Sequence, residues 1–512
     1  MIDCILVLDF GGQYCHLIAR KVREFKVYSE IVPPDLTSED VDEYKKRYNV
    51  KGIIISGGPK SVYGKDILKF NRDLLNLGLG ILGLCYGHQL IAHTVGGNVK
   101  PGKKKEYGVT NAIIDKPKGI LKDLSGEEKV WMSHSDTVVE IPAEYEILAH
   151  TENTPVAAFG HKKKEIYGVQ WHPEVIHTEN GKKIFENFLF DICNCEPNWE
   201  MKDFIQETVR ELKQGVGDKK AIIALSGGVD SSTAAVLTSK AIGKNLYAIY
   251  VDTGLMRKNE TKSIKKIFTK KFDLNLIIVD ACKEFFKALK RVEDPEEKRK
   301  IIGEKFIRVF EKEAEKIKAD FLVQGTIYPD RIESGTKTAD KIKSHHNVGG
   351  LPHDLKLDLV EPLQDLYKDE VREVAKKLGL PDEIVYRHPF PGPGLAIRII
   401  GEVTSEAVDI VRKADYIVTE EIKRANLEKD LWQAFAVLLP VKSVGVQGDV
   451  RTYKNAIALR IVQSQDGMTA NFARIPYDVL ERISTRITNE ISQVNRVVYD
   501  LTHKPPGTIE WE

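Results

Sequence analysis

The chain has 512 residues, which is more than one hydrophobic core usually organises, so we expect two to four domains. Hydrophobic residues make up 42% of the sequence and charged residues 29%, values typical of a soluble globular protein. The formal net charge is only +1 and no apolar run is long enough to span a bilayer, so we expect neither a nucleic-acid partner nor a membrane partner.

The cysteine content bears on the cellular compartment. Six cysteines in a chain of this length do not indicate a disulfide framework, and they favour a reducing compartment. We therefore predict a cytoplasmic protein. Cys193 and Cys195 lie two apart, but no second Cys/His pair at zinc-like spacing accompanies them, so we interpret this pair as incidental.

Short apolar runs alternate with helical patterns in the first part of the chain. Four runs are predicted to be buried strands: CILVLDF, GIIISGG, GILGL and YGVQW. FENFLFDIC is predicted to be a closing helix, and NCEPNWE a domain boundary. This alternation is typical of a doubly wound α/β domain, expected over residues 1–193, with functional loops at the carboxyl ends of its strands.

The third strand leads into Gly83-Leu84-Cys85-Tyr86-Gly87, which fits the G-x-nucleophile-x-G pattern of a nucleophile elbow. Flanking glycines let the backbone pass close by, and the helix N-terminus favours the thiolate. The N–H of Tyr86 would face an oxyanion, and Gly58, which ends another strand, would supply a second donor. A buried structural cysteine is the alternative, and the elbow alone does not decide between the two.

A candidate base and its orienting carboxylate follow the fourth strand. His172 and Glu174 lie two residues apart, so they project to the same side of extended backbone, which suits a Cys-His-Glu arrangement. Residues 1–193 resemble class I glutamine amidotransferases, on the motifs DFGGQY, SGGP, GLCYGHQ, MSHSD and QWHPE. The resemblance implies that Cys85 attacks the side-chain amide of glutamine, forming a thioester and releasing ammonia. It also implies that glutamine contacts Gln89, Ser135 and Asp136.

The alternation of strand and helix patterns begins again after a helix expected near residues 201–212. A second α/β domain is predicted over residues 197–386, with strands in AIIALSGG, LYAIYVDTG, NLIIVDA and DFLVQGT. AIIALSGGVDSS places a Ser/Gly loop between a strand and a helix, where N–H groups and hydroxyls can hold phosphate. No Gly-Lys-Ser/Thr closes the loop, so it is not a Walker A motif. An ordinary glycine turn is the alternative.

SGGVDSS resembles the PP-loop of ATP pyrophosphatases, which cleave ATP between its α- and β-phosphates. The resemblance implies that ATP binds to the loop residues Ser226, Gly227, Gly228, Val229, Asp230, Ser231 and Ser232. Asp230 would also hold Mg²⁺, a hard cation that prefers carboxylate and phosphate oxygens. Residues 337–352 are polar and basic, and we interpret them as a lid over the phosphates, in which His345 and His346 make a poor chelate. We assign no role to Arg291.

From Arg387 the sequence becomes rich in proline and glycine, in the turn-forming segment RHPFPGPGL. Paired strands and a helix, PYDVLERISTRITNEI, are predicted after it. We predict an α+β domain over residues 387–512. RHPFPGPGL, GVQGDVRTY, FARIPYDVL and the terminal KPPGTIEWE resemble the family of glutamine-hydrolysing GMP synthases, and the match covers essentially the whole chain. The resemblance implies a homodimer, and contacts to xanthosine 5′-monophosphate (XMP) from Asp449, Arg451, Lys504 and Glu510.

The two modules together imply a ligase that passes ammonia to an adenylated carbonyl, with glutamine, ATP and XMP as small-molecule substrates. Two alternatives stay open from the sequence. The first is another glutamine-dependent, AMP-forming amide ligase built on the same modules. The second is a regulatory or scaffold protein with relic sites, which would need damaged motifs. Cys85, His172, Glu174 and the SGGVDSS loop are all intact.

Overall fold

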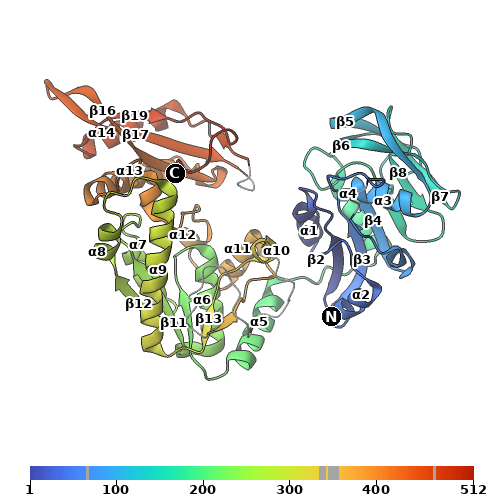
Figure 1. The fold of residues 1–512 in the computed structure, drawn as a ribbon, viewed down its shortest axis with the longest axis horizontal. Coiled ribbons are helices and arrows are strands. Elements are labelled where there is room, and N and C mark those ends of the chain that lie inside the picture. Colours follow the sequence, from blue (N-terminus) through green and yellow to red (C-terminus); the bar gives the residue numbers. More distant parts are fainter. Residues whose placement is uncertain (65–67, 334–341, 344–356, 465–468) are drawn as a thin grey trace. The chain divides into compact units, whose positions relative to one another are not determined.

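The computed structural model describes residues 1–64, 68–333, 342–343, 357–464 and 469–512. The chain divides into two compact units, Met1–Phe204 and Ile205–Glu512 (Figure 1). His345 and His346 of the predicted lid lie outside the described residues, and within that segment only a short strand, Ile342–Lys343, is described. No helix in the described ranges is both long enough and apolar enough to cross a membrane.

The first unit is built on a nine-stranded sheet in the order β2-β1-β3-β4-β9-β8-β7-β5-β6 (Figure 1). Pairing is parallel from β2 to β9 and antiparallel from β9 to β6. The strands are β1 (Asp3–Leu8), β2 (Tyr28–Val32), β3 (Asn49–Ile55), β4 (Gly80–Leu84), β5 (Asn98–Ile114), β6 (Gly126–Glu140), β7 (Tyr145–His150), β8 (Ala158–His161) and β9 (Ile166–Val169). The four strands predicted from apolar runs are β1, β3, β4 and β9.

The first unit contains four α-helices among the described residues, and a capping box starts one of them. They are α1 (Cys15–Glu24), α2 (Ser38–Lys45), α3 (Tyr86–Thr94) and α4 (Gly181–Glu186), with 3₁₀ turns at Arg72–Asn76 and Gly119–Leu121. A capping box formed by Thr37 and Asp40 starts α2. The predicted closing helix, residues 185–193, begins at the end of α4 and consists mostly of a π-helical turn, Asn187–Ile192. All six residues of β1 are buried, as expected for a central parallel strand covered on both faces.

The second unit begins with a six-stranded sheet in the order β12-β11-β10-β13-β15-β14, parallel except for β14. Its strands are β10 (Ala221–Ala224), β11 (Leu246–Asp252), β12 (Asn275–Asp280), β13 (Phe321–Val323), β14 (Ile342–Lys343) and β15 (Asp358–Val360). Its helices are α5 (Met201–Val216), α6 (Val229–Ile242), α7 (Glu260–Lys270), α8 (Cys282–Ala288), α9 (Pro295–Ile317), α10 (Tyr328–Glu333), α11 (Lys368–Lys377) and α12 (Asp382–Val385). The predicted doubly wound α/β class is confirmed.

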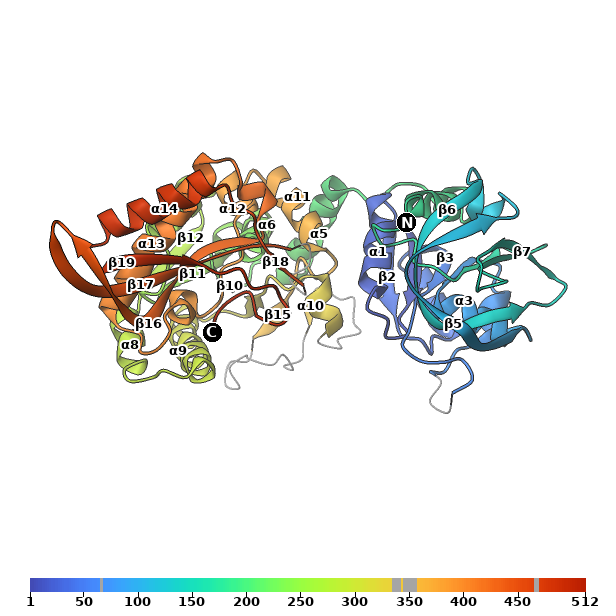
Figure 2. The ribbon, with the colours of Figure 1, turned by 90° about the horizontal axis from the view of Figure 1, so that it is seen from above.

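The last part of the chain forms a four-stranded, mostly antiparallel sheet with two helices packed against it (Figure 2). Its elements are α13 (Ser405–Arg424), β16 (Gln433–Gln447), β17 (Val450–Gln463), β18 (Asn471–Phe472), α14 (Tyr477–Glu490) and β19 (Val494–Tyr499), with 3₁₀ turns at Gly243–Asn245, Gly394–Arg398 and Glu428–Asp430 in the same unit. One cluster of buried apolar residues includes Ile222 and Leu322 of the six-stranded sheet. It also includes Val411 of α13 and Ile457 of β17. The domain boundary drawn between residues 386 and 387 therefore stays a prediction.

Candidate active sites

The elbow at Cys85 has the geometry that its glycines permit. Cys85 follows β4 directly, caps α3, and has φ 52° and ψ −101°, a conformation that costs energy in any residue with a Cβ atom. A Cβ atom on Gly83 would lie 2.5 Å from the carbonyl oxygen of Gly87, and one on Gly87 would lie 2.2 Å from that of Ile55. Both flanking positions therefore require glycine.

His172 and Glu174 lie beside the thiol, in the turn that follows β9 and not on extended backbone. His172 Nδ1 lies 2.7 Å from Glu174 Oε1, and both side chains are buried. Burial disfavours the imidazolium, but the charges of Glu174 and Cys85 outweigh it and raise the pKa of His172 to about 11. The ring of Tyr14 meets the imidazole edge-on, at 4.9 Å between centroids. This environment favours the imidazolium form of His172.

Backbone carbonyls of β6 contact the thiol of Cys85 and the backbone of His172. Cys85 Sγ lies 3.6 Å from the carbonyl oxygen of Ser133. The backbone N–H of His172 donates to the carbonyl oxygen of Trp131 at 3.0 Å. Gln170 Nε2 also lies 3.8 Å from Cys85 Sγ. Sequence reasoning quoted Gln170 and Ser133 only as motif letters and gave neither a role. The missing signal was the packing of β6 against the elbow, which brings together residues about 40 to 50 positions apart in the chain.

The predicted oxyanion donors lie at the same place. A Cβ atom on Gly57 would be 3.2 Å from His172 Cε1 and 3.8 Å from Cys85 Cβ, so this glycine turn lies directly over the reacting pair. A Cβ atom on Gly58 would be 3.4 Å from Tyr86 Cγ. The turn after β3 and the start of α3 are therefore adjacent.

The predicted glutamine contacts lie close to the thiol. Gln89 Nε2 donates to the backbone oxygen of Asp136 at 2.8 Å, and both side chains are buried. Ser135 is the neighbouring residue of the same strand, β6. The carboxylate of Asp136 accepts hydrogen bonds from Tyr63, at 2.7 Å, and from Ser61. Ser61 and Tyr63 were not predicted from the sequence, and they connect Asp136 to the loop that carries Gly58.

The Ser/Gly loop connects β10 to α6 and forms a compact phosphate-sized cradle. The hydroxyls of Ser226 and Ser231 lie 2.9 Å apart and share a hydrogen bond, and the N–H of Gly228 donates to Ser226 Oγ at 3.3 Å. Gly227 has φ +75°, which favours glycine. Val229, Asp230 and Ser232 follow in the first turn of α6. The loop therefore presents hydroxyls and N–H groups at a helix N-terminus, where an anion is stabilised.

One carboxylate oxygen of Asp230 has an ion-pair partner, and the other has no hydrogen-bond partner among the described residues. The first is Oδ2, which forms an ion pair with Lys368, and the second is the buried Oδ1. A hard divalent cation prefers such a carboxylate oxygen together with phosphate oxygens. The donor set therefore fits Mg²⁺ bound between Asp230 and a nucleotide. Lys368 was not predicted, because 138 residues separate it from Asp230.

Arg387 is a second cation at this loop. Its Nη1 donates to the carbonyl oxygen of Gly227 at 3.0 Å and its Nη2 to Glu260 Oε1 at 2.7 Å. The sequence placed Arg387 at the start of the turn-rich connector but gave it no role. Its contact shows that the connector reaches the phosphate cradle.

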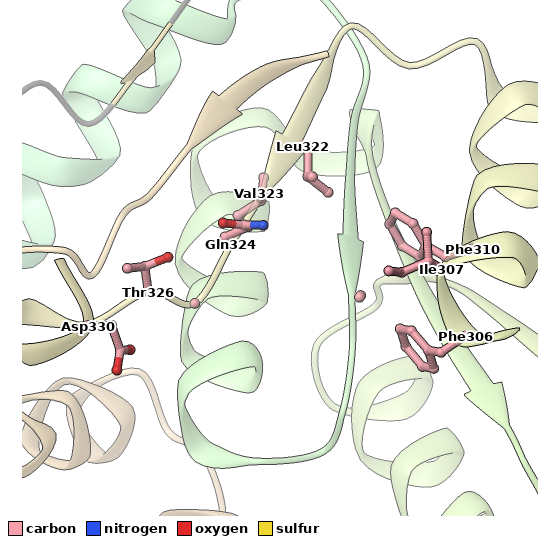
Figure 3. A pocket seen from close by; sticks show the side chains of 10 residues that line it. Phe306, Ile307, Phe310, Leu322, Val323, Gln324, Thr326 and Asp330 are labelled. Atoms are coloured by element: carbon pink, nitrogen blue, oxygen red, sulfur yellow. The ribbon is translucent and has the colours of Figure 1, made fainter. Parts of the chain in front are cut away.

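A cavity of about 450 Å³ opens beside the cradle, at the ends of β10 and β13 (Figure 3). Phe306, Ile307 and Phe310 of α9 gather on one side, and Thr326 and Asp330 lie on the other (Figure 3). The remaining lining residues are Ala224, Leu322, Val323, Gln324 and Gly325. Because β10 has β11 on one side and β13 on the other, the cavity lies where the strand order changes direction, the usual ligand position in open α/β sheets.

The C-terminal segment is docked through buried arginines. Arg398, fully buried, donates to both carboxylate oxygens of Glu510 at 3.1 and 3.0 Å. Gln433 Nε2 lies 3.2 Å from Glu510 Oε1. Arg460, also fully buried, donates to the carbonyl oxygens of three residues of the segment, Thr502, Thr508 and Ile509. Lys504, within that segment, pairs through its backbone with Ala470.

The other two predicted XMP contacts lie elsewhere in the chain. Asp449 and Arg451 are at the turn of the hairpin formed by β16 and β17, and both are exposed. Arg451 is nine residues along β17 from Arg460, which at about 3.3 Å per residue corresponds to roughly 30 Å. The structure therefore does not bring Arg451 together with Lys504 and Glu510 within one chain.

Three further residues named in the sequence analysis lie outside both candidate sites. Arg291 has φ +64° and its N–H donates to Glu402 at 2.8 Å. Cys193 and Cys195 are buried, and burial raises the pKa of the Cys193 thiol. No group of three or more metal-ligating side chains occurs within the ranges that the structure describes.

Comparison with known proteins assigns three parts of the chain to families. Residues 6–192 match Glutamine amidotransferase class-I, residues 199–332 match NAD synthase, and residues 420–511 match the GMP synthase C terminal domain. Three curated relatives are each 54% identical to this chain and are each named GMP synthase [glutamine-hydrolyzing]. They come from Clostridium botulinum (strain Langeland / NCTC 10281 / Type F), over 100% of this chain and 99% of the relative; Clostridium perfringens (strain 13 / Type A), over 100% of both; and Clostridium acetobutylicum, over 99% of both.

Proposed function

The chain belongs to the family of glutamine-hydrolysing GMP synthases, and we propose that it divides that reaction between the elbow of its first unit and the Ser/Gly loop of its second. It is an ATP-dependent, AMP-forming carbon–nitrogen ligase that uses glutamine as amido donor. The observation that carries this conclusion is the 54% identity with relatives of that name over their whole length. Another AMP-forming amide ligase on the same modules is thereby the weaker alternative.

In the first unit, the Cys85 thiolate attacks the side-chain amide carbon of glutamine. The N–H groups of Gly58 and Tyr86 hold the oxyanion that forms, a contribution worth about 10²–10³ in rate per donor. His172, oriented by Glu174, protonates the departing ammonia, and water then hydrolyses the thioester to glutamate.

In the second unit, O2 of XMP attacks the α-phosphorus of ATP and pyrophosphate leaves. Ammonia then adds at C2 of the adenylated purine and displaces AMP, which gives GMP. An amide-like oxygen is a poor leaving group, and adenylation turns it into a good one. The chain's own contribution is to hold the nucleotide: the N–H groups and hydroxyls of residues 226–232 bind its phosphates.

The cation site and the cavity complete the nucleotide contacts. Asp230 would hold Mg²⁺, which would neutralise charge on the departing pyrophosphate. The open Oδ1 oxygen of Asp230 supports this assignment. The cavity beside the loop is apolar on its α9 side and polar at Thr326 and Asp330, a combination that suits a purine ring.

We also propose a homodimer formed through the hairpin of β16 and β17. Val444 lies opposite Tyr453 and Val446 opposite Arg451, so these side chains share one face of the hairpin. Val446 is 72% exposed and Tyr453 67%, so the face is apolar and uncovered in a single chain. Pairing of two such faces would bury it, and would place Asp449 and Arg451 at the interface, where they are available to a partner's XMP site.

Replacing Tyr453 by glutamate should weaken this dimer, because it would bury a charge without a partner. Light scattering after gel filtration measures the outcome: the wild-type chain is expected near twice the mass of one chain and the variant near one. Tyr477→Glu is the matched control, since Tyr477 is 89% exposed on α14. A wild-type chain that runs as a monomer contradicts the proposal.

The experiment that tests the proposed function is an assay of glutamate and AMP with and without XMP, ATP and Mg²⁺. AMP is expected only when XMP, ATP and Mg²⁺ are all present. AMP formation with a different acceptor and none with XMP would identify another ligase. All six cysteines are free, which supports the proposal of a cytoplasmic location.

A further inference from the structure

A buried carboxylate–imidazole pair lies behind the proposed glutamine contacts, and neither member has a part in the chemistry above. Glu106 is on β5 and His134 on β6, and the two residues face each other in the strand register. His134 Nε2 lies 3.1 Å from Glu106 Oε2, and both side chains are 4% exposed. His134 belongs to the sequence MSHSD, which also contains Ser135 and Asp136.

Glu106 is held as a buried anion. Its carboxylate accepts hydrogen bonds from the hydroxyls of Thr151, at 2.9 Å, and Thr154, at 2.6 Å. Burial acts to raise its pKa, but the hydrogen bonds from His134, Thr154 and Thr151 outweigh burial and lower the pKa of Glu106 to about 2. Buried polar and charged pairs often add little net stability compared with well-packed apolar residues, so this carboxylate–imidazole pair calls for another explanation.

The β5–β6 ladder is broken at the residues that the pair adjoins. Pro101 pairs with Asp136 and Glu106 pairs with His134, so the four residues 102–105 oppose Ser135 alone. A bulge of this size removes ladder hydrogen bonds at Ser135. Side chains replace them: His134 Nδ1 donates to the backbone oxygen of Asp136 at 2.8 Å.

The same carbonyl oxygen connects the pair to the thiol. Gln89 Nε2 donates to the backbone oxygen of Asp136 at 2.8 Å, and it also donates to Gln170 Oε1 at 3.1 Å. Gln170 in turn lies against Cys85 Sγ at 3.8 Å. One continuous series of buried polar contacts therefore runs from Glu106 to the reacting sulfur.

We propose that Glu106 and His134 are positioning residues that fix residues 133–136 of β6 for glutamine binding. The proposal rests on the proposed function, because Ser135 and Asp136 are glutamine contacts only if Cys85 hydrolyses glutamine. Without Glu106, His134 loses the partner that sets its ring, and the Asp136 backbone then loses one of the two donors that hold it beside the bulge.

Glu106→Leu tests the proposal, because leucine is of similar size and makes no hydrogen bond. The KM for glutamine is expected to rise about tenfold or more, the scale of a lost buried hydrogen-bonded partner. The rate at which iodoacetamide alkylates Cys85 should stay within about twofold of wild type, because the elbow itself is untouched. Ammonia-dependent GMP formation should be unchanged.

The matched control is Asp115→Leu. Asp115 forms a similar pair with His150, at 2.9 Å, but both side chains are more than a third exposed and no contact connects them to the thiol in the described part of the chain. This variant is expected to keep the wild-type KM. Glu106→Gln, which retains an acceptor for the threonine hydroxyls, should give a smaller rise in KM than Glu106→Leu, and it decides the matter if Glu106→Leu does not fold.

Two results would overturn the positioning role. The first is a wild-type KM for glutamine in Glu106→Gln and in any folded Glu106→Leu. The second is a loss of glutaminase kcat and of Cys85 alkylation together with a lowered Tm at unchanged KM, the pattern of a purely structural residue. A wild-type chain that releases no glutamate would instead refute the proposed function.

Discussion

Cys85→Ala is expected to abolish GMP formation from glutamine and to leave GMP formation from ammonia intact. Loss of a nucleophile that acts together with its base costs about 10⁴–10⁶ in rate, so the glutamine reaction should fall to background. Free ammonia can reach the second unit without the thiol, and we therefore expect the ammonia reaction to stay within about twofold of wild type. GMP is measured with either nitrogen source at a pH near 8.5, where enough ammonia is unprotonated.

Cys195→Ala is the control for this experiment. Cys195 is buried to nearly the same extent as Cys85, at 7% against 6% exposure, and it lies in the same unit. It should support both reactions at wild-type rates. Glutamate release by Cys85→Ala at the wild-type rate would contradict the assignment of the nucleophile, and loss of both reactions together would contradict the separation of the two sites.

Asp230→Ala is expected to have the opposite pattern, with GMP formation lost from both nitrogen sources. The variant removes the carboxylate proposed for Mg²⁺ and leaves Lys368 without its ion-pair partner. We expect a loss of at least about 10³ in rate, because a charge on the transferring phosphates is no longer compensated. AMP, pyrophosphate and GMP are measured with ammonia as donor, so that the first unit does not limit the rate.

Alkylation of Cys85 by iodoacetamide should proceed normally in Asp230→Ala, which shows that the first unit is intact. Asp273→Ala is the matched control, since Asp273 is an exposed aspartate of the same unit that pairs with Lys244. It is expected to behave like wild type. Ammonia-dependent GMP formation by Asp230→Ala at an undiminished rate would exclude Asp230 from the nucleotide site.

The parts of the sites that sequence could predict are local in the chain. The elbow at Cys85 consists of five consecutive residues, and His172 and Glu174 lie two apart in the turn that follows β9. The Ser/Gly loop is likewise continuous from strand to helix. In each of these cases the backbone between the residues fixes their relative positions, so a short pattern carries the geometry.

The parts that sequence missed depend on contacts between distant residues. Lys368 reaches Asp230 across 138 positions, and Arg387 reaches Gly227 across 160. Ser61 and Tyr63 reach Asp136 only because the loop after β3 packs against β6. Nothing in the neighbourhood of these residues in the chain specifies which partner the fold will bring to them.

The elements of the fold that could be predicted were likewise those with a continuous local sequence pattern. The apolar runs predicted the central strands, since buried parallel strands are apolar throughout. The β5–β6 hairpin was not predicted, because lysines at 103–105 interrupt its pattern; these residues belong to the excursion that breaks the ladder opposite Ser135. Arg398 and Arg460, which hold the C-terminal segment, were not identified from the sequence.

The most direct test of the account is to follow the amide nitrogen of glutamine into GMP. The chain is incubated with glutamine labelled with ¹⁵N in its side-chain amide, together with XMP, ATP and Mg²⁺, and the products are quantified by mass spectrometry. The account predicts ¹⁵N in the 2-amino group of GMP, with glutamate, AMP, pyrophosphate and GMP formed in equal amounts. GMP without the label, or glutamate and AMP formed while XMP is not consumed, would contradict it.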